Sequence, residues 1–247
     1  NPRVNEVVAS LPGFAHAHPL SRADEVQGVL RAFLALERVL AEVSGLDHVS
    51  LQPAAGAHGE LTALMMIRAY HEERGDAARR KVLVPDSAHG TNPSSCTIAG
   101  FEALEVRSAP DGTVDLDDLR SKAGPEVAAM MITNPNTLGI FEQEITEIAR
   151  LLHENGSFLY MDGANMNALM GIARPGDMGV DCMHLNLHKT FGTPHGGGGP
   201  GSGPVLVKKE LEPFLPRPRI VQDESGQVSL MGDCPQSIGQ VHSLLGN

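Results

Sequence analysis

The chain has 247 residues, of which 41% are hydrophobic and 20% are charged, and this ordinary globular composition excludes a disordered or fibrous protein. Its 19 basic and 30 acidic residues give a formal net charge of −11, which argues against a nucleic-acid partner, because binding phosphate backbones needs clustered Lys and Arg. The sequence holds no apolar stretch long enough to span a bilayer and no signal-peptide pattern at its start, so we expect no membrane partner and a cytoplasmic location.

The first long helix is predicted over residues 22–44. Apolar side chains recur there at spacings of three and four, which is the period of an amphipathic helix. Ser21 is the expected N-cap, and Gly45 directly follows the last periodic residue. A second helix is predicted after Gly59, ending near Arg74, because the same spacing returns between these two residues.

From residue 81 onward, short apolar runs alternate with helical patterns. The runs predict strands and the periodic segments between them predict helices. The predicted strands are 81–87, 104–109, 127–135, 157–164, 181–188 and 204–209, the last of the chain, and the predicted helices among them are 114–123 and 142–156. This alternation predicts an α/β fold in which helices cover a mostly parallel sheet.

The two ends of the chain show weaker patterns. Residues 213–247 contain Pro213, Pro216, Pro218 and Pro235 and little periodicity, which is typical of a linker. The sequence starts at Asn1 without a Met and stops in mid-pattern. We therefore expect it to be part of a longer polypeptide.

Polar residues follow the predicted strands, at the sheet edge where open α/β sheets bind ligands. Lys189 follows one strand, where a desolvated amine would have a lowered pKa and could attack a carbonyl carbon, although a surface lysine is the ordinary alternative. Asp162 lies at the end of another, where it could cap a turn or pair with a cation such as a protonated pyridine nitrogen. The 27 residues between them leave room for one crossover, so both side chains can face one ligand.

Two glycine-containing segments are candidates for anion binding. Residues 53–60 (PAAGAHGE) place small residues and free N–H groups before a helix, which suits a phosphate, although a tight turn is an equal alternative. Residues 196–201 satisfy the pattern G-x-G-x-x-G, but a strand follows instead of a helix, so a dinucleotide fingerprint is rejected. The run is more typical of a mobile loop.

The histidines and cysteines give weaker signals. His89, within DSAHGTNP, could lie face-on to an aromatic ligand or make ordinary loop hydrogen bonds. His184 and His188 lie four residues apart, but no local carboxylate or cysteine completes a ligand set, so no metal is expected. The cysteines have no paired spacing and are expected to be reduced thiols: Cys96, Cys182 and Cys234.

Five segments in this order resemble the glycine dehydrogenase (decarboxylating) family, the P-protein of the glycine cleavage system, in its C-terminal half or second subunit. They are LQPAAGAHGE (51–60), DSAHGTNP (86–93), TNPNTLGIFE (133–142), YMDGANMNA (160–168) and NLHKTFGTPHGGGGPG (186–201). The resemblance covers nearly the whole chain. It implies a fold-type I pyridoxal-phosphate large domain over 51–212, an N-terminal helical segment over 1–50, and a linker over 213–247 toward a C-terminal small domain.

The resemblance also implies roles for single residues. Lys189 would be the Schiff-base lysine, Asp162 the partner of the pyridine nitrogen, and His89 the residue that stacks on the cofactor ring. The phosphate would lie among Ala55, Gly56 and His188, with Asn134 near the ring hydroxyl. Thr91 and Ala164 would be neighbours without an assigned role.

The implied activity is pyridoxal-phosphate-dependent decarboxylation of glycine, with transfer of the aminomethyl group to the lipoyl arm of the H-protein. Residues 196–201 would then suit a loop that admits this arm. The implied partners are a complementary P-protein subunit or N-terminal half, in a hetero-oligomer, and we do not expect catalysis by this chain alone. Two alternatives remain: another fold-type I enzyme, such as an aminotransferase or cysteine desulfurase, and a catalytically silent scaffold subunit.

Overall fold

The computed structural model describes residues 3–195 and 201–246. Its N-terminal part is helical, with two short helices, α1 (Arg3–Ala9) and α2 (Pro12–Ala15), before the long helix α3 (Gln27–Ser44). Helix α3 begins five residues later than predicted, because Val26 and not Ser21 occupies the N-cap position. It ends at Ser44, as predicted. The following residue, Gly45, has a φ of 71°, a backbone conformation that favours glycine.

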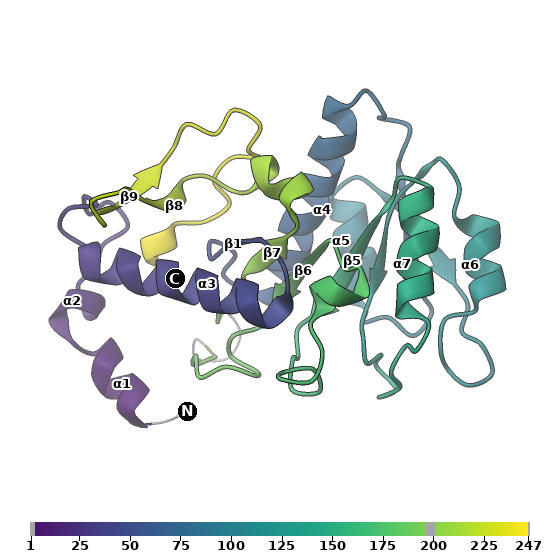
Figure 1. The fold of residues 1–247 in the computed structure, drawn as a ribbon, viewed down its shortest axis with the longest axis horizontal. Helices are drawn as coiled ribbons and strands as arrows, with labels where there is room; N and C mark the ends of the chain where they lie inside the picture. The colour runs from purple at the N-terminus through teal and green to yellow at the C-terminus, as the bar shows by residue number, and fades with distance from the viewer. Residues whose placement is uncertain (1–2, 196–200, 247) are drawn as a thin grey trace.

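A seven-stranded sheet forms the centre of the molecule (Figure 1). The strand order is β1-β7-β6-β5-β4-β2-β3, and the neighbours from β6 to β3 run parallel, while β7 is antiparallel to both β6 and β1. The strands are β1 (His48–Ser50), β2 (Lys81–Pro85), β3 (Glu102–Val106), β4 (Val127–Ile132), β5 (Phe158–Gly163), β6 (Cys182–Leu185) and β7 (Val205–Val207). The predicted α/β fold with a mostly parallel sheet is confirmed.

Helices cover both faces of this sheet. On one face lie α4 (Gly56–Glu73) and α5 (Thr91–Ile98), and on the other lie α3, α6 (Leu116–Lys122) and α7 (Ile145–Glu154) (Figure 1). Successive residues of the central strands alternate between the two cores: Met130 belongs to the core that includes α3 and α7, whereas Met131 belongs to the core that includes α4 and α5. The central strands β4 and β5 are buried on both faces, which explains their nearly continuous apolar sequences.

The segment after β7 is more ordered than its sequence indicates. It holds the short helical turns η2 (Lys209–Phe214) and η3 (Leu244–Gly246) and a hairpin of β8 (Arg219–Gln222) and β9 (Val228–Met231). The prediction that 204–209 is the last strand is therefore wrong. Buried residues of this segment join the core around α3: Ile220, Val228, Leu244 and Leu245. The proposed boundaries at residues 50 and 212 stay predictions.

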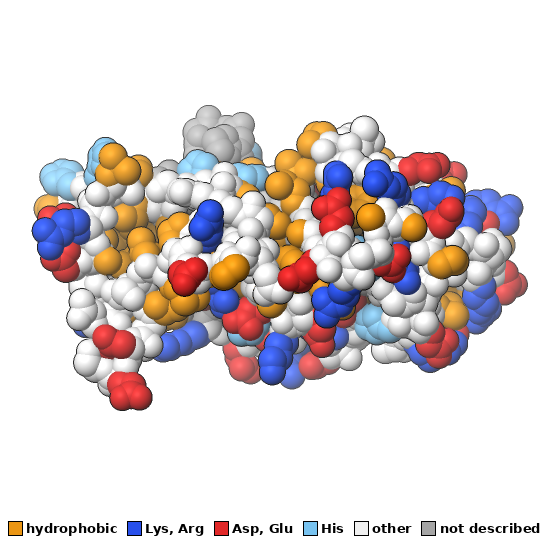
Figure 2. Space-filling view, turned by 90° about the horizontal axis from the view of Figure 1, so that it is seen from above, with side chains coloured by type: hydrophobic (Ala, Val, Ile, Leu, Met, Phe, Trp, Pro, Cys, Tyr) orange, Lys and Arg blue, Asp and Glu red, His pale blue; other side chains and the backbone are white. Residues whose placement is uncertain are grey.

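Charged side chains are mixed on the surface. On the face drawn in Figure 2, acidic and basic groups are interspersed, most densely toward the end of the molecule that carries α6 and α7. The acidic excess of the sequence is therefore not gathered into one patch on that face. In the described part of the chain, no helix is both long and apolar enough to cross a membrane.

Candidate active site

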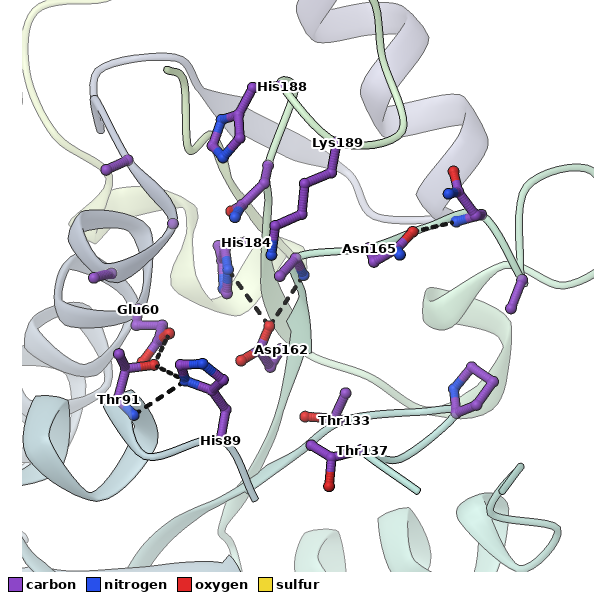
Figure 3. A pocket seen from close by; sticks show the side chains of 18 of the residues that line it. Glu60, His89, Thr91, Thr133, Thr137, Asp162, Asn165, His184, His188 and Lys189 are labelled. Atoms are coloured by element: carbon purple, nitrogen blue, oxygen red, sulfur yellow. Dashed lines mark hydrogen bonds and ion pairs between the residues drawn. The ribbon is translucent and has the colours of Figure 1, made fainter. Parts of the chain in front are cut away.

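A cavity of about 590 Å³ opens at the C-terminal ends of β2, β4, β5 and β6 (Figure 3). Its wall consists of the loops that follow these strands together with the first turn of α4. Small-molecule and cofactor sites commonly have this size. The carboxyl edge of the sheet, where the sequence predicts ligand binding, therefore holds a large cavity.

Asp162 lies at the end of β5, opposite His184 on the neighbouring strand β6. Its side chain is only 6% exposed, and it accepts hydrogen bonds from the Asn92 amide (3.1 Å) and the Ala164 N–H (3.0 Å). Burial, the largest single influence, raises the pKa of Asp162, but the nearby His184 and the two hydrogen bonds outweigh it. The net pKa lies below its ordinary value, so Asp162 is a buried, ionised carboxylate at neutral pH.

His184 connects Asp162 to a buried phenol. Its Nε2 lies 3.5 Å from Oδ1 of Asp162, and its Nδ1 makes a short hydrogen bond with the Tyr160 hydroxyl. Both rings are fully buried, and burial raises the pKa of Tyr160 well above its usual value. The phenol therefore stays neutral and can donate to His184, which leaves Nε2–H to face Asp162.

Lys189 lies in the turn after β6, where its N–H donates to the Asn186 carbonyl (3.0 Å). Because β5 and β6 are adjacent and parallel, the predicted single crossover between Asp162 and Lys189 is confirmed. The Lys189 side chain points into the cavity toward Asp162 and His184 (Figure 3). The side chain is exposed, so the expected desolvation of this amine is not observed.

The first turn of α4 packs closely against the loop after β6. A Cβ on Gly56 would lie 2.2 Å from Oδ1 of Asn186, so only glycine fits there without displacing that side chain. Helix α4 begins at Gly56, four residues before the predicted start, and its N-cap residue, Ala55, also lines the cavity. The segment expected to bind phosphate therefore lies beside the same cavity as Lys189.

His188 also lines the cavity. Its ring is half-buried, and burial lowers its pKa, with further lowering by the neighbouring His195 and Lys189. A Cβ on Gly201 would lie 2.3 Å from Nδ1 of His188, so the end of the glycine run packs against this ring. Residues 196–200, on which the lipoyl-loop hypothesis depends, lie outside the described residues.

His89 lies in the loop before α5 and is exposed. Its Nδ1 lies 2.8 Å from Oγ1 of Thr91, whose hydroxyl donates to the buried carboxylate of Glu60 (2.8 Å). His89, Thr91 and Glu60 all line the cavity (Figure 3). Ala164, the other neighbour without an assigned role, lines it as well.

Asn134 is the one predicted site residue that does not reach the cavity wall among the described residues. It is 2% exposed, and its Oδ1 accepts the Glu142 N–H (3.0 Å), so its side chain holds the loop after β4. Its neighbours Thr133 and Pro135 line the cavity instead.

The sequence reasoning gave no role to Glu60 and considered His184 only as a metal ligand. The structure places Glu60, Asp162 and His184 with one ligand atom each within 4.8 Å of one another. The two carboxylates already accept hydrogen bonds from side chains or backbone of the chain itself, which accounts for their burial without an ion. No sequence signal indicated Glu60, because the hydrogen bonds to its carboxylate come from α5, a helix that the sequence did not predict.

The sequence and the fold are similar to those of known proteins. Residues 3–230 match the family model of the glycine cleavage system P-protein. Over its whole length the chain is 59% identical to a probable glycine dehydrogenase (decarboxylating) subunit 2 of Caldanaerobacter subterraneus subsp. tengcongensis and 61% identical to one of Shouchella clausii, and it covers 51% and 50% of these relatives. The chain thus spans about half the length of the curated relatives it matches.

Solved structures with low sequence identity share the fold. A crystal structure of glycine decarboxylase (P-protein) of the glycine cleavage system, in inhibitor-bound form, aligns with a TM-score of 0.78 at 23% identity, covering 99% of this chain and 56% of that one. A NifS-like protein aligns with a TM-score of 0.70 at 14% identity, covering 99% and 63%.

Proposed function

Since this chain belongs to the glycine cleavage system P-protein family, we propose that it forms the pyridoxal-phosphate site of a glycine decarboxylase. One observation carries the proposal: Lys189 and Asp162, on adjacent parallel strands, converge on one large cavity beside the start of a long helix. The chain spans about half the length of its relatives, so the proposed substrate and partners rest on the names of those relatives.

The residues of the cavity wall suit this cofactor. Among the described residues, three buried polar atoms that belong to the wall have no hydrogen-bond partner: Thr133 Oγ1, Asn186 Oδ1 and His188 Nδ1. Buried polar atoms are nearly always paired in native proteins, so unpaired atoms around a cavity favour a polar ligand. The absent Cβ at Gly56 lets the Asn186 side chain pack against the start of α4, whose N–H groups suit an anion.

Each proposed contact uses a property of this chain. Lys189 would attach the cofactor covalently through its amine, and the ionised Asp162 would hold a proton on the pyridine nitrogen. Ala55, Gly56 and His188 would hold the phosphate, while His89 would stack on the ring. When bound, pyridoxal phosphate supplies an electron sink for the carbanion that remains after carbon dioxide leaves.

The buried surroundings of Asp162 strengthen its effect. A carboxylate that is 6% exposed acts in a medium of low dielectric constant, where its attraction for a nearby proton is larger than in water. His184, which also lines the cavity, lies 3.5 Å from Oδ1 of Asp162 and helps to hold the carboxylate in place. Lys189, by contrast, is exposed in this cavity.

The proposal also includes a partner, a substrate and a reaction. The name "subunit 2" of the relatives supports a complementary subunit as partner. The names of the family and of the relatives support glycine as the substrate. We propose in addition that the aminomethyl group is transferred to the lipoyl arm of the H-protein, an oxidation of glycine coupled to disulfide reduction. The family match favours this reaction over aminotransfer or desulfuration, because fold neighbours such as the NifS-like protein share only the architecture.

The test uses the full-length protein, assembled with its complementary subunit and loaded with pyridoxal phosphate. After borohydride reduction, peptide mass spectrometry should locate a pyridoxyl group on Lys189, and the variant Lys189→Ala should lack both the label and glycine–carbon dioxide exchange. The variant Lys209→Ala, at an exposed position outside the cavity wall, should keep both. Label without exchange, but with amino transfer to an oxoacid, would favour the aminotransferase alternative; no label at all would favour the scaffold.

A further inference from the structure

Tyr160 and His184 form a buried pair beside Asp162, and the proposed function gives Tyr160 no role. Tyr160 and Asp162 lie two residues apart on β5, so both side chains point to the same face of the sheet. His184 lies opposite Asp162 on β6 and contacts both side chains, the Tyr160 hydroxyl with Nδ1 and Oδ1 of Asp162 with Nε2, the latter at 3.5 Å. The two rings are 0% and 1% exposed, so bulk water does not compete for these contacts.

Helix α4 packs directly on His184 from the other side. A Cβ on Gly59 would lie 2.7 Å from Cβ of His184, so only glycine lets the helix approach this strand so closely. The close helix and the two contacts within the sheet together fix the position of the imidazole ring.

The phenol has one proton, and its position decides where the proton of His184 lies. Among the described residues, the Tyr160 hydroxyl makes a hydrogen bond with Nδ1 alone, and no backbone N–H donates to either ring nitrogen. If the phenol donates to Nδ1, the proton of the neutral ring lies on Nε2 and faces the ionised Asp162. A proton on Nδ1, in the neutral or the cationic ring, would leave the buried phenol proton without an acceptor, which is costly.

We propose that Tyr160, acting through His184, keeps Asp162 fixed and fully charged for the ring nitrogen of pyridoxal phosphate. The Nε2–H faces one carboxylate oxygen, while the Asn92 amide binds the other (3.1 Å). Tyr160 and His184 are positioning residues in this scheme, because both act through Asp162. The effect on the cofactor rests on the proposed function, whereas the direction of the hydrogen bond follows from the chain's own contacts.

Removal of the phenol hydroxyl would free Nδ1 of His184. The ring could then turn away, or it could take up a second proton on Nδ1. A turned ring no longer holds the carboxylate, and a cationic ring cancels its charge. Either change weakens the attraction of Asp162 for the pyridine nitrogen and leaves the rest of the cofactor site as it was.

The first measurement is magic-angle-spinning NMR of the sedimented, cofactor-free full-length protein, assembled with its complementary subunit. Histidine carries ¹⁵N and tyrosine carries ¹³C at Cζ, so the strongest dipolar coupling between the two identifies Nδ1 of His184. Protonated and unprotonated ring nitrogens differ strongly in chemical shift. Wild type should show Nε2–H and an unprotonated Nδ1, and a proton on Nδ1 would overturn the proposal.

The second measurement compares the Kd for pyridoxal phosphate with the Kd for its 1-deaza analogue, in which C–H replaces the ring nitrogen. An effect that acts through Asp162 weakens only the first ligand. In Tyr160→Phe, the preference for pyridoxal phosphate over the analogue should fall roughly fivefold, as expected for the loss of one hydrogen bond. The matched control is Tyr70→Phe, at the other tyrosine of the sequence, which is half-buried and outside the cavity wall. It should leave the preference unchanged.

Equal weakening of both ligands in Tyr160→Phe would show a packing role alone and overturn the proposal, as would two unaltered Kd values. His184→Gln, whose amide can still donate to Asp162, should keep more of the preference than His184→Leu. The wild-type spectrum decides where the proton lies should Tyr160→Phe fail to fold. This spectrum needs no cofactor and is therefore independent of the labelling of Lys189, whereas binding of neither ligand would count against the proposed function.

Discussion

The close contact between Gly56 and Asn186 makes the cavity sensitive to a single methyl group. In Gly56→Ala the new Cβ would overlap Oδ1 of Asn186, so either that side chain or the first turn of α4 must move. Because both flank the proposed phosphate position, we expect the Kd for pyridoxal phosphate to rise roughly tenfold, or about 1.4 kcal/mol. Absorbance titration of the full-length protein measures this.

Gly28→Ala is the matched control for this substitution. Gly28 lies in the first turn of α3, and a Cβ there meets no described atom within 4 Å. Alanine at this site should leave the Kd unchanged and stabilise the helix by up to about 1 kcal/mol. Equal Kd values for the two variants would show that the Asn186 contact has no bearing on the cofactor.

At the level of single residues, the sequence predicted side chains at strand ends better than side chains inside helices or loops. Lys189 and Asp162 were predictable together, because strand order and the length of one crossover fix where both lie. Glu60 was not predictable, because the hydrogen bonds that hold its carboxylate come from α5, a helix that the sequence did not indicate. Asn134 does not line the cavity, because the Glu142 N–H binds its side-chain oxygen, and its place near the ring hydroxyl stays a prediction.

The positions of the main elements were predictable, but their ends were not. Apolar periodicity located the major helices and the parallel strands, yet several predicted strands continue into residues that the structure assigns to loops. Helix α5 was missed because its sequence, TNPSSCTI, has few apolar residues and a proline in the first turn. The β8–β9 hairpin was missed because its short strands are only partly buried.

The packing of α3 against β8 predicts a pH effect on stability. Glu37 of α3 lines a small cavity with Arg219, and burial raises its pKa from 4.5 to about 8 despite the opposing charge of that arginine. A raised carboxyl pKa means that the folded state binds the proton more tightly than the unfolded state. The stabilisation of the folded state by the protonated Glu37 side chain is present in full below the unfolded pKa of 4.5. It is lost as the pH rises through the folded pKa of about 8.

The free energy of unfolding of wild type should therefore decrease relative to Glu37→Gln between about pH 5 and pH 9, because glutamine carries no titrating proton. Urea denaturation at several pH values measures this difference. Glu224→Gln, at an exposed position, removes the same charge and should run parallel to wild type. A difference between wild type and Glu37→Gln that does not vary with pH would contradict the raised pKa.

Across the whole molecule, Gln27 joins two parts of the chain that are 201 residues apart. Its amide donates to the Val228 carbonyl (2.6 Å) and accepts the Val228 N–H (3.1 Å), so it pairs with β9 as a backbone group would. Gln27→Ala should lower the free energy of unfolding by about 1–3 kcal/mol, because both backbone groups lose this partner. Hydrogen exchange over residues 219–231 should accelerate.

The exposed Gln143 provides the comparison. Gln143→Ala should change stability by less than about 0.5 kcal/mol and leave exchange in the hairpin as it is in wild type. Unaltered protection of β9 in Gln27→Ala would mean that the hairpin is held by its apolar contacts alone.

Helix α3 and strand β1 pack against elements that are synthesised much later, and this order affects folding during translation. Strand β1 enters the sheet only beside β7, and α3 meets β8 and β9, so both wait for residues beyond 205 to be synthesised. At about 5–20 residues per second, the apolar side of α3 would remain without these neighbours for roughly ten to forty seconds. A nascent chain of this design has its greatest need of a chaperone between the synthesis of α3 and that of β9, and release from it should coincide with emergence of the hairpin from the ribosome.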